Sequence, residues 1–132
     1  MGAVEDIAAR LEAQIPSRTV YPHAVPSGKT IPASYLVVHG SEGSEESTRS
    51  SDAVNVQTPA VWVTSVSRND NPLAAAREAS WAAGRVRAAL RNFRPGGRWS
   101  VRAEVSQPAR RDESISATTF YAVEQFSVRT SL

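Results

Sequence analysis

The stretch SGKT, residues 27–30, contains the residue types with which phosphate-binding loops hold nucleotides. A complete loop of that kind also has a glycine five residues before Gly28, and a helix follows it directly. Here His23 occupies the position of that glycine, and the next two residues, Ile31 and Pro32, cannot begin a helix. The sequence therefore predicts a glycine turn between prolines and no nucleotide site.

Histidine, cysteine and carboxylate side chains do not form the clusters that catalysis or metal binding requires. Metal sites use three or four ligands at close spacing, whereas His23 and His39 are the only histidines and cysteine is absent. No G-x-S-x-G turn of a serine hydrolase occurs, and the acidic stretch 42–46 lacks the spacing of a calcium loop. We therefore expect no catalytic residue, no metal site and no cofactor, so that the protein is not an enzyme. A small-molecule site near His39 is the enzymatic alternative.

Trp81 is the side chain that most strongly indicates binding. It lies in the stretch 69–93, whose apolar residues recur at helical spacing on one face. At about 100° per residue, Trp81 points about 160° away from the centre of that face. Arg77 and Arg85 lie one turn on either side and can stack on the indole. Trp81 is therefore either an interface anchor or a partly exposed side chain under the loop 40–53.

Two helices must position these residues. The first is an amphipathic helix expected over residues 4–15 and stopped by Pro16; its apolar residues at helical spacing are Val4, Ile7, Ala8, Leu11 and Ile15. The second is expected from Pro72, with Asp70 or Asn71 as its cap, to the RPGG stretch at 94–97. Its predicted core face consists of Leu73, Ala76, Ala79, Ala83, Val86, Leu90 and Phe93.

Five strands are expected, at about 19–21, 34–40, 53–68, 98–108 and 118–129. Pro59 lies within the third, which implies an edge position or a bulge. The fourth alternates Trp99, Val101, Ala103 and Val105 with polar residues and is expected to be half exposed. Between the second and third strands, residues 40–52 contain no large apolar side chain and predict a mobile loop.

The order helix, strand, strand, strand, helix, strand, strand favours an α+β fold. We expect a mixed, mostly antiparallel β-sheet with two α-helices packed on one face. At 132 residues, the chain is expected to form a single domain over residues 1–132. No secretory signal and no apolar run long enough to span a membrane is found in it.

A charged arm, about residues 107–117, precedes the last strand and is too polar to enter a core. Its charged side chains are Arg110, Arg111, Asp112 and Glu113. In the strand that follows, the apolar residues change face near Glu124, which indicates a bulge or a strand covered on both sides. Because neither segment resembles an active site, we interpret both as parts of an assembly interface.

The formal net charge of +2 conceals an asymmetry along the chain. Residues 1–66 carry four basic and seven acidic side chains, whereas residues 67–132 carry eleven basic and six acidic ones. Such a chain can stack on copies of itself or on other charged rings. The alternative is an ordinary surface with uneven charge.

Three stretches of the sequence resemble one family of virion proteins. They are VYPHAVPSGKTIPASYLVVHG, VTSVSRNDNPLAAAREASWAAGRVRAALRNFRPGGR and SQPARRDESISATTFYAVEQFSVR. In that order they resemble the tail terminator proteins of long-tailed bacteriophages of actinobacteria. The resemblance spans about residues 4–130. Its most specific parts are the beginning of the second helix and the closing arm and strand.

The resemblance implies a structural protein of the virion, located at the junction of tail and neck after assembly in the host cytoplasm. It implies a homohexameric ring that caps the major tail tube protein and offers its other face to the head-completion, or stopper, protein. The expected interface residues are Arg77, Trp81, Arg85, Arg110, Arg111, Asp112 and Glu113. Glu42, Glu45 and Glu46 are expected to face the lumen, close to the genomic DNA that passes through it.

Two alternatives stay open at this point. The first is another ring protein of the head–tail connector. The second is a nucleic-acid-binding domain, which the arginines of residues 67–132 favour. Against it, those arginines alternate with acidic residues and lie in no aromatic stacking motif.

Overall fold

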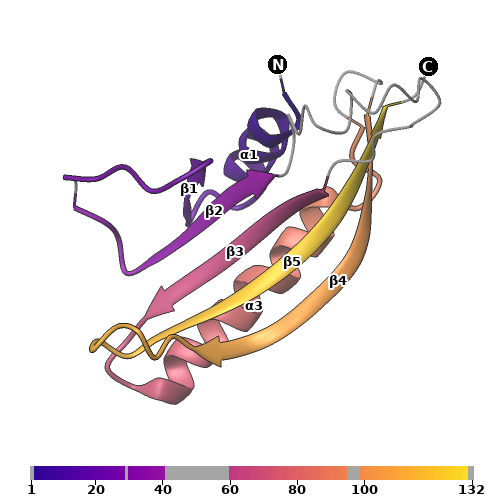
Figure 1. The fold of residues 1–132 in the computed structure, drawn as a ribbon. Helices are drawn as coiled ribbons and strands as arrows, with labels where there is room; N and C mark the ends of the chain where they lie inside the picture. The colour runs from indigo at the N-terminus through magenta and orange to yellow at the C-terminus, as the bar shows by residue number, and fades with distance from the viewer. Residues whose placement is uncertain (1, 29, 41–59, 95–98, 131–132) are drawn as a thin grey trace, which may run out of the picture.

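The computed structural model describes residues 2–28, 30–40, 60–94 and 99–130. Two helices and five strands follow one another in the predicted order (Figure 1). They are α1 Ala3–Gln14, β1 Thr19–Pro22, β2 Ser34–Gly40, β3 Ala60–Arg68, α3 Pro72–Leu90, β4 Trp99–Arg111 and β5 Thr119–Thr130.

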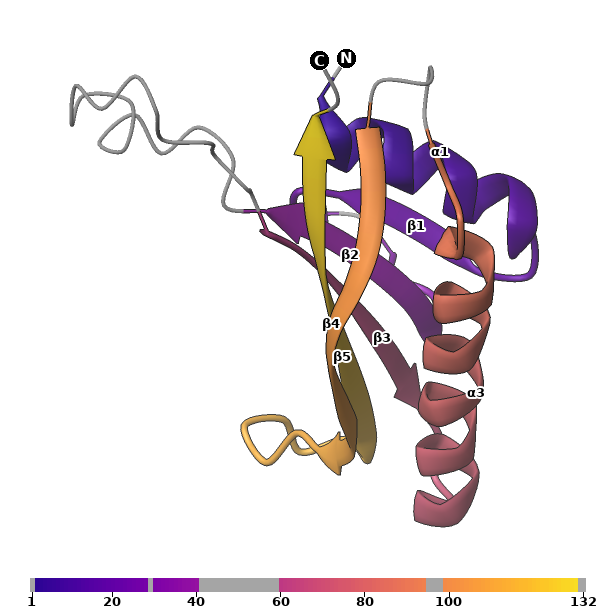
Figure 2. The ribbon, with the colours of Figure 1, turned by 90° about the vertical axis from the view of Figure 1, so that its right-hand side faces the viewer.

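The strands form one mixed sheet in the order β1-β2-β3-β5-β4. β1 pairs with β2 in parallel, and the other three pairs are antiparallel. Both helices lie on the same face of this sheet, with α3 crossing β3, β5 and β4 (Figures 1 and 2). The expected α+β fold, with a mixed, mostly antiparallel sheet and two helices on one face, is confirmed.

The core lies between the helices and the face of the sheet that they cover. Strict alternation along β2, β3 and β5 directs every second side chain into it. The largest fully buried apolar side chains are Phe126, Ile7, Leu11, Ile15, Leu36 and Leu90. The buried apolar residues of α1 confirm the predicted amphipathic face: they are Ala3, Val4, Ile7, Ala8 and Leu11.

The cap of α3 is Asn71, one of the two residues that the sequence allowed. Its side-chain oxygen accepts hydrogen bonds from the backbone N–H groups of Leu73 and Ala74, at 3.0 and 3.3 Å. These bonds satisfy two of the donors that the first turn of a helix leaves without a partner. Pro72 stands in that first turn, as predicted.

The predicted core face of α3 is wrong at Leu73, which is 58% exposed. The predicted face is confirmed at Ala79, Ala83, Val86 and Leu90, which are buried, and the buried side also includes Ala75, Ala82 and Ala89. Small alanine side chains allow a helix to lie close to the sheet, and this orientation turns the first leucine towards solvent.

Two predictions about the strands need correction, the edge position of the third strand and the start of the charged arm. β3 lies in the interior of the sheet, between β2 and β5, so the described part of that strand is not at an edge; residues 53–59 lie outside the described residues. The charged arm is not a separate loop from residue 107, because β4 continues through Arg111. Only residues 112–118 connect the two last strands.

The change of face in β5 arises without a bulge in that strand. Both shifts of register belong to β4, which has an extra residue between Ala103 and Val105 and another between Gln107 and Arg110. For this reason Ala103 and Val105 do not share one face, and both are exposed. The apolar pattern of β5 is interrupted because a polar residue, Glu124, takes a position on the core face.

Candidate interaction surface

Trp81 lies on the outer side of α3 and is 48% exposed, which confirms that it points away from the core. The guanidinium carbon of Arg85 lies 6.0 Å from the centre of its ring, as the spacing along the helix allowed. A closer cation, Arg18, lies over the same ring at 5.0 Å. Arg18 belongs to the connection between α1 and β1, so the indole also joins α3 to the first part of the chain.

No pattern in the sequence relates Arg18 to Trp81. The two residues belong to different elements, and only the packing of α1 beside α3 brings them together. The Nε atom of Arg18 is buried and has no hydrogen-bond partner among the described residues. Cation–π attraction to the indole therefore accounts for the position of its guanidinium.

We define the outer row of α3 as Leu73, Arg77, Trp81 and Arg85. These residues follow one another at intervals of four, so they lie along one side of the helix, and all of them are exposed. Among the described residues, neither Arg77 nor Arg85 takes part in an ion pair. The row therefore presents two large apolar side chains and two unpaired cations on one surface.

The charged residues of the arm do not join this row. Arg110 and Arg111 form the end of β4, whereas Asp112 and Glu113 begin the connection to β5. In Figure 2 this connection projects from the side of the sheet opposite to α3. The expected interface residues thus form two separate groups, one on α3 and one at the end of β4 and the start of the connection to β5.

Asp112 is held as an anion by its own turn. Its Oδ1 atom accepts hydrogen bonds from the backbone N–H of Ser114, at 3.0 Å, and from the Ser114 hydroxyl, at 2.5 Å. These bonds lower the pKa of the Asp112 carboxyl group. In the described part of the chain Oδ2 accepts no hydrogen bond, so it can receive a donor from outside.

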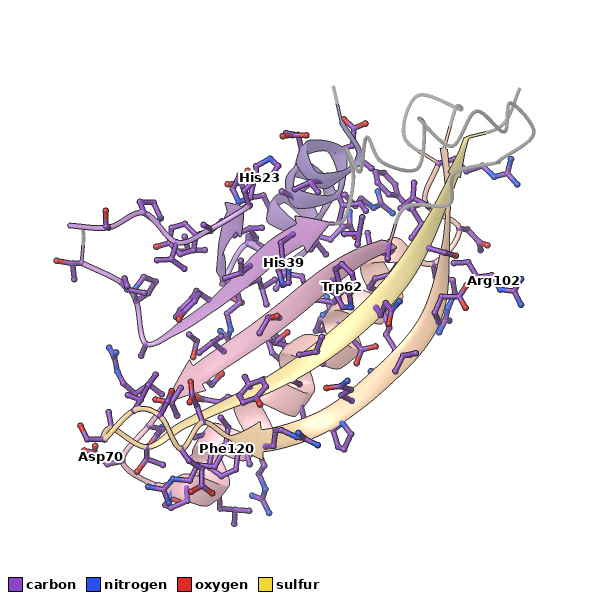
Figure 3. The ribbon with its side chains drawn as sticks, viewed as in Figure 1. His23, His39, Trp62, Asp70, Arg102 and Phe120 are labelled. Carbon is purple, nitrogen blue, oxygen red and sulfur yellow. The ribbon has the colours of Figure 1, made fainter. Side chains whose placement is uncertain are left out.

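The face of the sheet that no described helix covers carries aromatic side chains in pairs. The rings of His39 and Trp62 stack with their centres 5.9 Å apart, and those of Tyr21 and Tyr35 meet edge to face at 5.8 Å. Figure 3 shows His39 and Trp62 on the face turned to the viewer. Trp62 lies between Val61 and Val63, which are buried, so the alternation of β3 directs its side chain to the uncovered face.

A cavity of about 250 Å³ opens on this uncovered face, where the connection between β4 and β5 projects from the sheet. We call it the tyrosine pocket; its lining residues are Tyr35, Thr64, Val66, Asp112, Ile115 and Tyr121. Burial raises the pKa of the Tyr35 hydroxyl, so this group stays protonated and can donate a hydrogen bond. The pocket combines two aromatic rings with one carboxylate.

A second cavity, of about 230 Å³, lies between α3 and the β4–β5 pair. Arg87, Ser106 and Glu124 lie in its lining. Both the guanidinium and the hydroxyl already donate to the same carboxylate oxygen, at 2.7 and 2.6 Å. Because its charged groups satisfy one another, this cavity is explained as part of the packing of three elements.

The described residues contain no group of three or more histidine, cysteine or acidic side chains that could hold a metal ion. None of the described helices is long and apolar enough to cross a membrane.

Glu42, Glu45 and Glu46, with the rest of the loop 41–52, lie outside the described residues, so their expected position in a lumen stays a prediction. No protein-family model matches the chain, and no curated protein matches it.

Proposed function

We propose that the chain is a tail terminator, a structural protein of a phage virion that caps the tail tube as a homohexameric ring. The ring would join the major tail tube protein to the head-completion protein at the junction of tail and neck, with no enzymatic activity and no cofactor. The resemblance of three stretches of the sequence to tail terminators supports this proposal. The structural observation that carries it is the outer row of α3.

The outer row has the chemistry of a protein–protein interface. Tryptophan and arginine are the residue types that most often dominate binding energy at interfaces, and here they alternate on one exposed side of a helix. A closed ring needs a head-to-tail contact in which each subunit uses two different surfaces. The outer row lies on α3, whereas the connection that carries Asp112 and Glu113 projects from the opposite side of the sheet (Figure 2), which suits such a contact.

Replacement of Trp81 by alanine tests the proposal. The variant should remain folded, because nearly half of the side chain is already exposed, and circular dichroism and thermal melting measure this. At each contact of a ring it should lose about 2 kcal/mol or more of binding free energy. Since that loss recurs around the ring, a phage lacking the gene for this chain should not be complemented by the variant.

Val105→Ala provides the matched control, because Val105 is 47% exposed but lies on β4, outside both groups. This control should complement the phage as well as the original chain does. A folded Trp81→Ala protein that complements fully would remove the outer row from the interface. Electron density for the chain in the capsid shell or baseplate would contradict the function itself, and density in another neck ring would favour a different connector protein.

The arginines at the end of β4 should act differently from Trp81. Arg110 and Arg111 are exposed, and charges at the rim of an interface mainly accelerate association. The double variant Arg110→Ala, Arg111→Ala should therefore weaken assembly more at low salt than at high salt. An equal loss at both salt concentrations would indicate that these residues are buried in the contact.

Nucleic-acid binding is the second candidate. The sequence contains no aromatic stacking motif, but the uncovered face of the sheet carries aromatic side chains from separate strands. His39 and Trp62 stack there, and Arg102 projects from the edge strand (Figure 3). Bases stack on aromatic rings of this kind in single-strand-binding proteins. Binding of single-stranded DNA that falls steeply with salt, and that Trp62→Ala abolishes, would favour this candidate over the ring.

A further inference from the structure

The outer row of α3 can supply only one side of a head-to-tail contact, so a second surface must receive it. Resting on the proposed self-assembly, we propose that the tyrosine pocket receives the Arg77 side chain of a second copy of the chain. Leu73 and Trp81 of that copy would then pack beside Ile115 at the rim of the pocket.

The chemistry of the tyrosine pocket fits a guanidinium group. Tyr35 and Tyr121 line it, and tyrosine rings attract cations through their quadrupole. The Oδ2 atom of Asp112 accepts no hydrogen bond from the described residues, since both bonds from Ser114 go to Oδ1. Arg110 lies next to Tyr121 in the sheet register but makes no ion pair with Asp112. The carboxylate is therefore available to a cation from another molecule.

The size of the pocket favours a side chain over a separate ligand. Its volume of about 250 Å³ lies below the roughly 300–1,000 Å³ that small-molecule sites usually enclose. The Ile115 side chain is 45% exposed at this site. It therefore offers apolar surface to Leu73 and Trp81, which flank Arg77 in the second copy.

Arg77 is the cation of the outer row that is free to enter. Arg85 lies over the Trp81 ring, whereas Arg77 makes no hydrogen bond, ion pair or ring contact with any described residue. It stands between Leu73 and Trp81, the two exposed apolar residues of the row. Insertion of its guanidinium would thus bring apolar surface to the rim of the pocket on both sides.

The positions of the two surfaces determine the kind of assembly. The outer row lies on the helical side of the molecule, and the connection that carries Asp112 and Ile115 projects from the opposite side of the sheet (Figure 2). A contact between them leaves one surface of each kind unused at the two ends. Further copies can therefore add until the assembly closes as a ring.

The absence of cysteine from the chain allows this contact to be trapped by oxidation. The variant Leu73→Cys, Ile115→Cys should form a ladder of disulfide-linked oligomers in the purified protein at high concentration. Either single variant alone should give no ladder, and a mixture of the two should stop at a heterodimer. Leu73→Cys, Val105→Cys is the matched control, because Val105 is as exposed as Ile115 but lies outside the pocket; it should give no ladder.

A charge exchange tests the arginine itself. Arg77→Asp and Asp112→Arg should each lower the extent of trapping about tenfold or more, and their combination should restore it. Equal trapping of the Ile115 and Val105 variants, or the absence of any ladder, would overturn the proposal, as would single charge variants that trap normally.

The outcomes separate this inference from the proposed function. A ladder from a protein that is then located outside the neck of the virion would support the contact and contradict the tail terminator. If the chain is located in the neck but shows no specific trapping, the tail terminator is supported and the proposed contact is contradicted. Trapping that single-stranded DNA abolishes by competition would assign the uncovered face to nucleic acid and would also overturn the proposed contact.

Discussion

Arg87 and Glu124 form an ion pair between α3 and β5, with 2.7 Å between Nη1 and Oε2. Glu124 is only 2% exposed, whereas the Arg87 side chain is 44% exposed, so the pair connects a buried anion to solvent. The hydroxyl of Ser106 on β4 donates to the same oxygen at 2.6 Å. One carboxylate therefore joins α3, β4 and β5, and β4 is the strand whose register shifts twice.

Arg87→Ala should destabilise the fold, because it leaves a buried carboxylate without its cation. Breaking a buried pair by removal of one partner is strongly destabilising, and the partial exposure of Arg87 reduces the expected loss to roughly 2–3 kcal/mol of unfolding free energy. Urea denaturation measures this loss. Arg91→Ala is the control: this arginine is exposed directly after the end of the same helix, and its replacement should change stability little.

The buried pair is expected to specify packing more than to add stability. The double variant Arg87→Met, Glu124→Leu should therefore recover most of the loss, because apolar side chains of similar size replace both charges. A double variant that is as unstable as Arg87→Ala would show that the ion pair contributes net stability.

Asn71→Ala should cost about 1 kcal/mol of unfolding free energy, because the first turn of α3 loses its side-chain acceptor. The sequence allowed either Asp70 or Asn71 as the cap, and the structure assigns both hydrogen bonds to Asn71. Asp70→Ala should accordingly be nearly neutral. Thermal melting distinguishes the two residues, with about 3–5 °C expected for Asn71→Ala. An equal loss for both variants would indicate a cap shared between them.

Elements of this fold were predictable where the signal is local. The periodicity of Ile7 and Leu11 defined α1, and the apolar run at 34–40 gave β2 with its observed bounds. Side-chain alternation and proline positions depend only on neighbouring residues, so they can be read along the chain. The exposed position of Trp81 followed from the same geometry.

The candidate surface was only partly predictable, because it depends on contacts between distant segments. Arg18 reaches Trp81 across two elements, and Asp112 meets Tyr35 and Tyr121 only after β5 is inserted beside β3. A buried glutamate also contradicts the expectation that carboxylates face water. No local pattern distinguishes it from an exposed one.

Stability should fall at acidic pH through Glu5, which contacts the imidazole Nε2 of His23 at 2.5 Å. The hydrogen bond with His23 is the main reason why the pKa of Glu5 is lowered from 4.5. Because the folded-state pKa lies below the unfolded value, this contribution is present above about pH 4.5 and is lost as the pH falls through the folded value. Urea denaturation at several pH values from about 6 to about 3 would show the decline.

His23→Gly separates this effect from backbone strain. His23 has a φ of 72°, a conformation that glycine adopts at no steric cost. The variant should therefore keep the backbone, yet its stability should depend less on pH below about 4.5 than that of the original chain. An unchanged pH dependence in His23→Gly would show that the pair contributes nothing measurable, as exposed ion pairs often do.

Two glycine-to-alanine substitutions should change stability in opposite directions. Gly84 lies within α3, and among the described residues outside its own helix backbone an added Cβ would meet only the Arg87 side chain, at 3.6 Å. Gly84→Ala should raise the unfolding free energy by about 0.5–1 kcal/mol, because glycine loses more backbone freedom in a helix.

At Gly40 an added Cβ would lie 3.1 Å from the carbonyl oxygen of Ala60 and 3.1 Å from a methyl group of Val4. The strand end there approaches both β3 and α1, and a backbone oxygen cannot move aside as a side chain can. Gly40→Ala should therefore destabilise the fold by about 1–3 kcal/mol, as overpacking usually does. Since both substitutions add the same methyl group, an equal change in melting temperature for both would mean that the close approach at Gly40 is absent in solution.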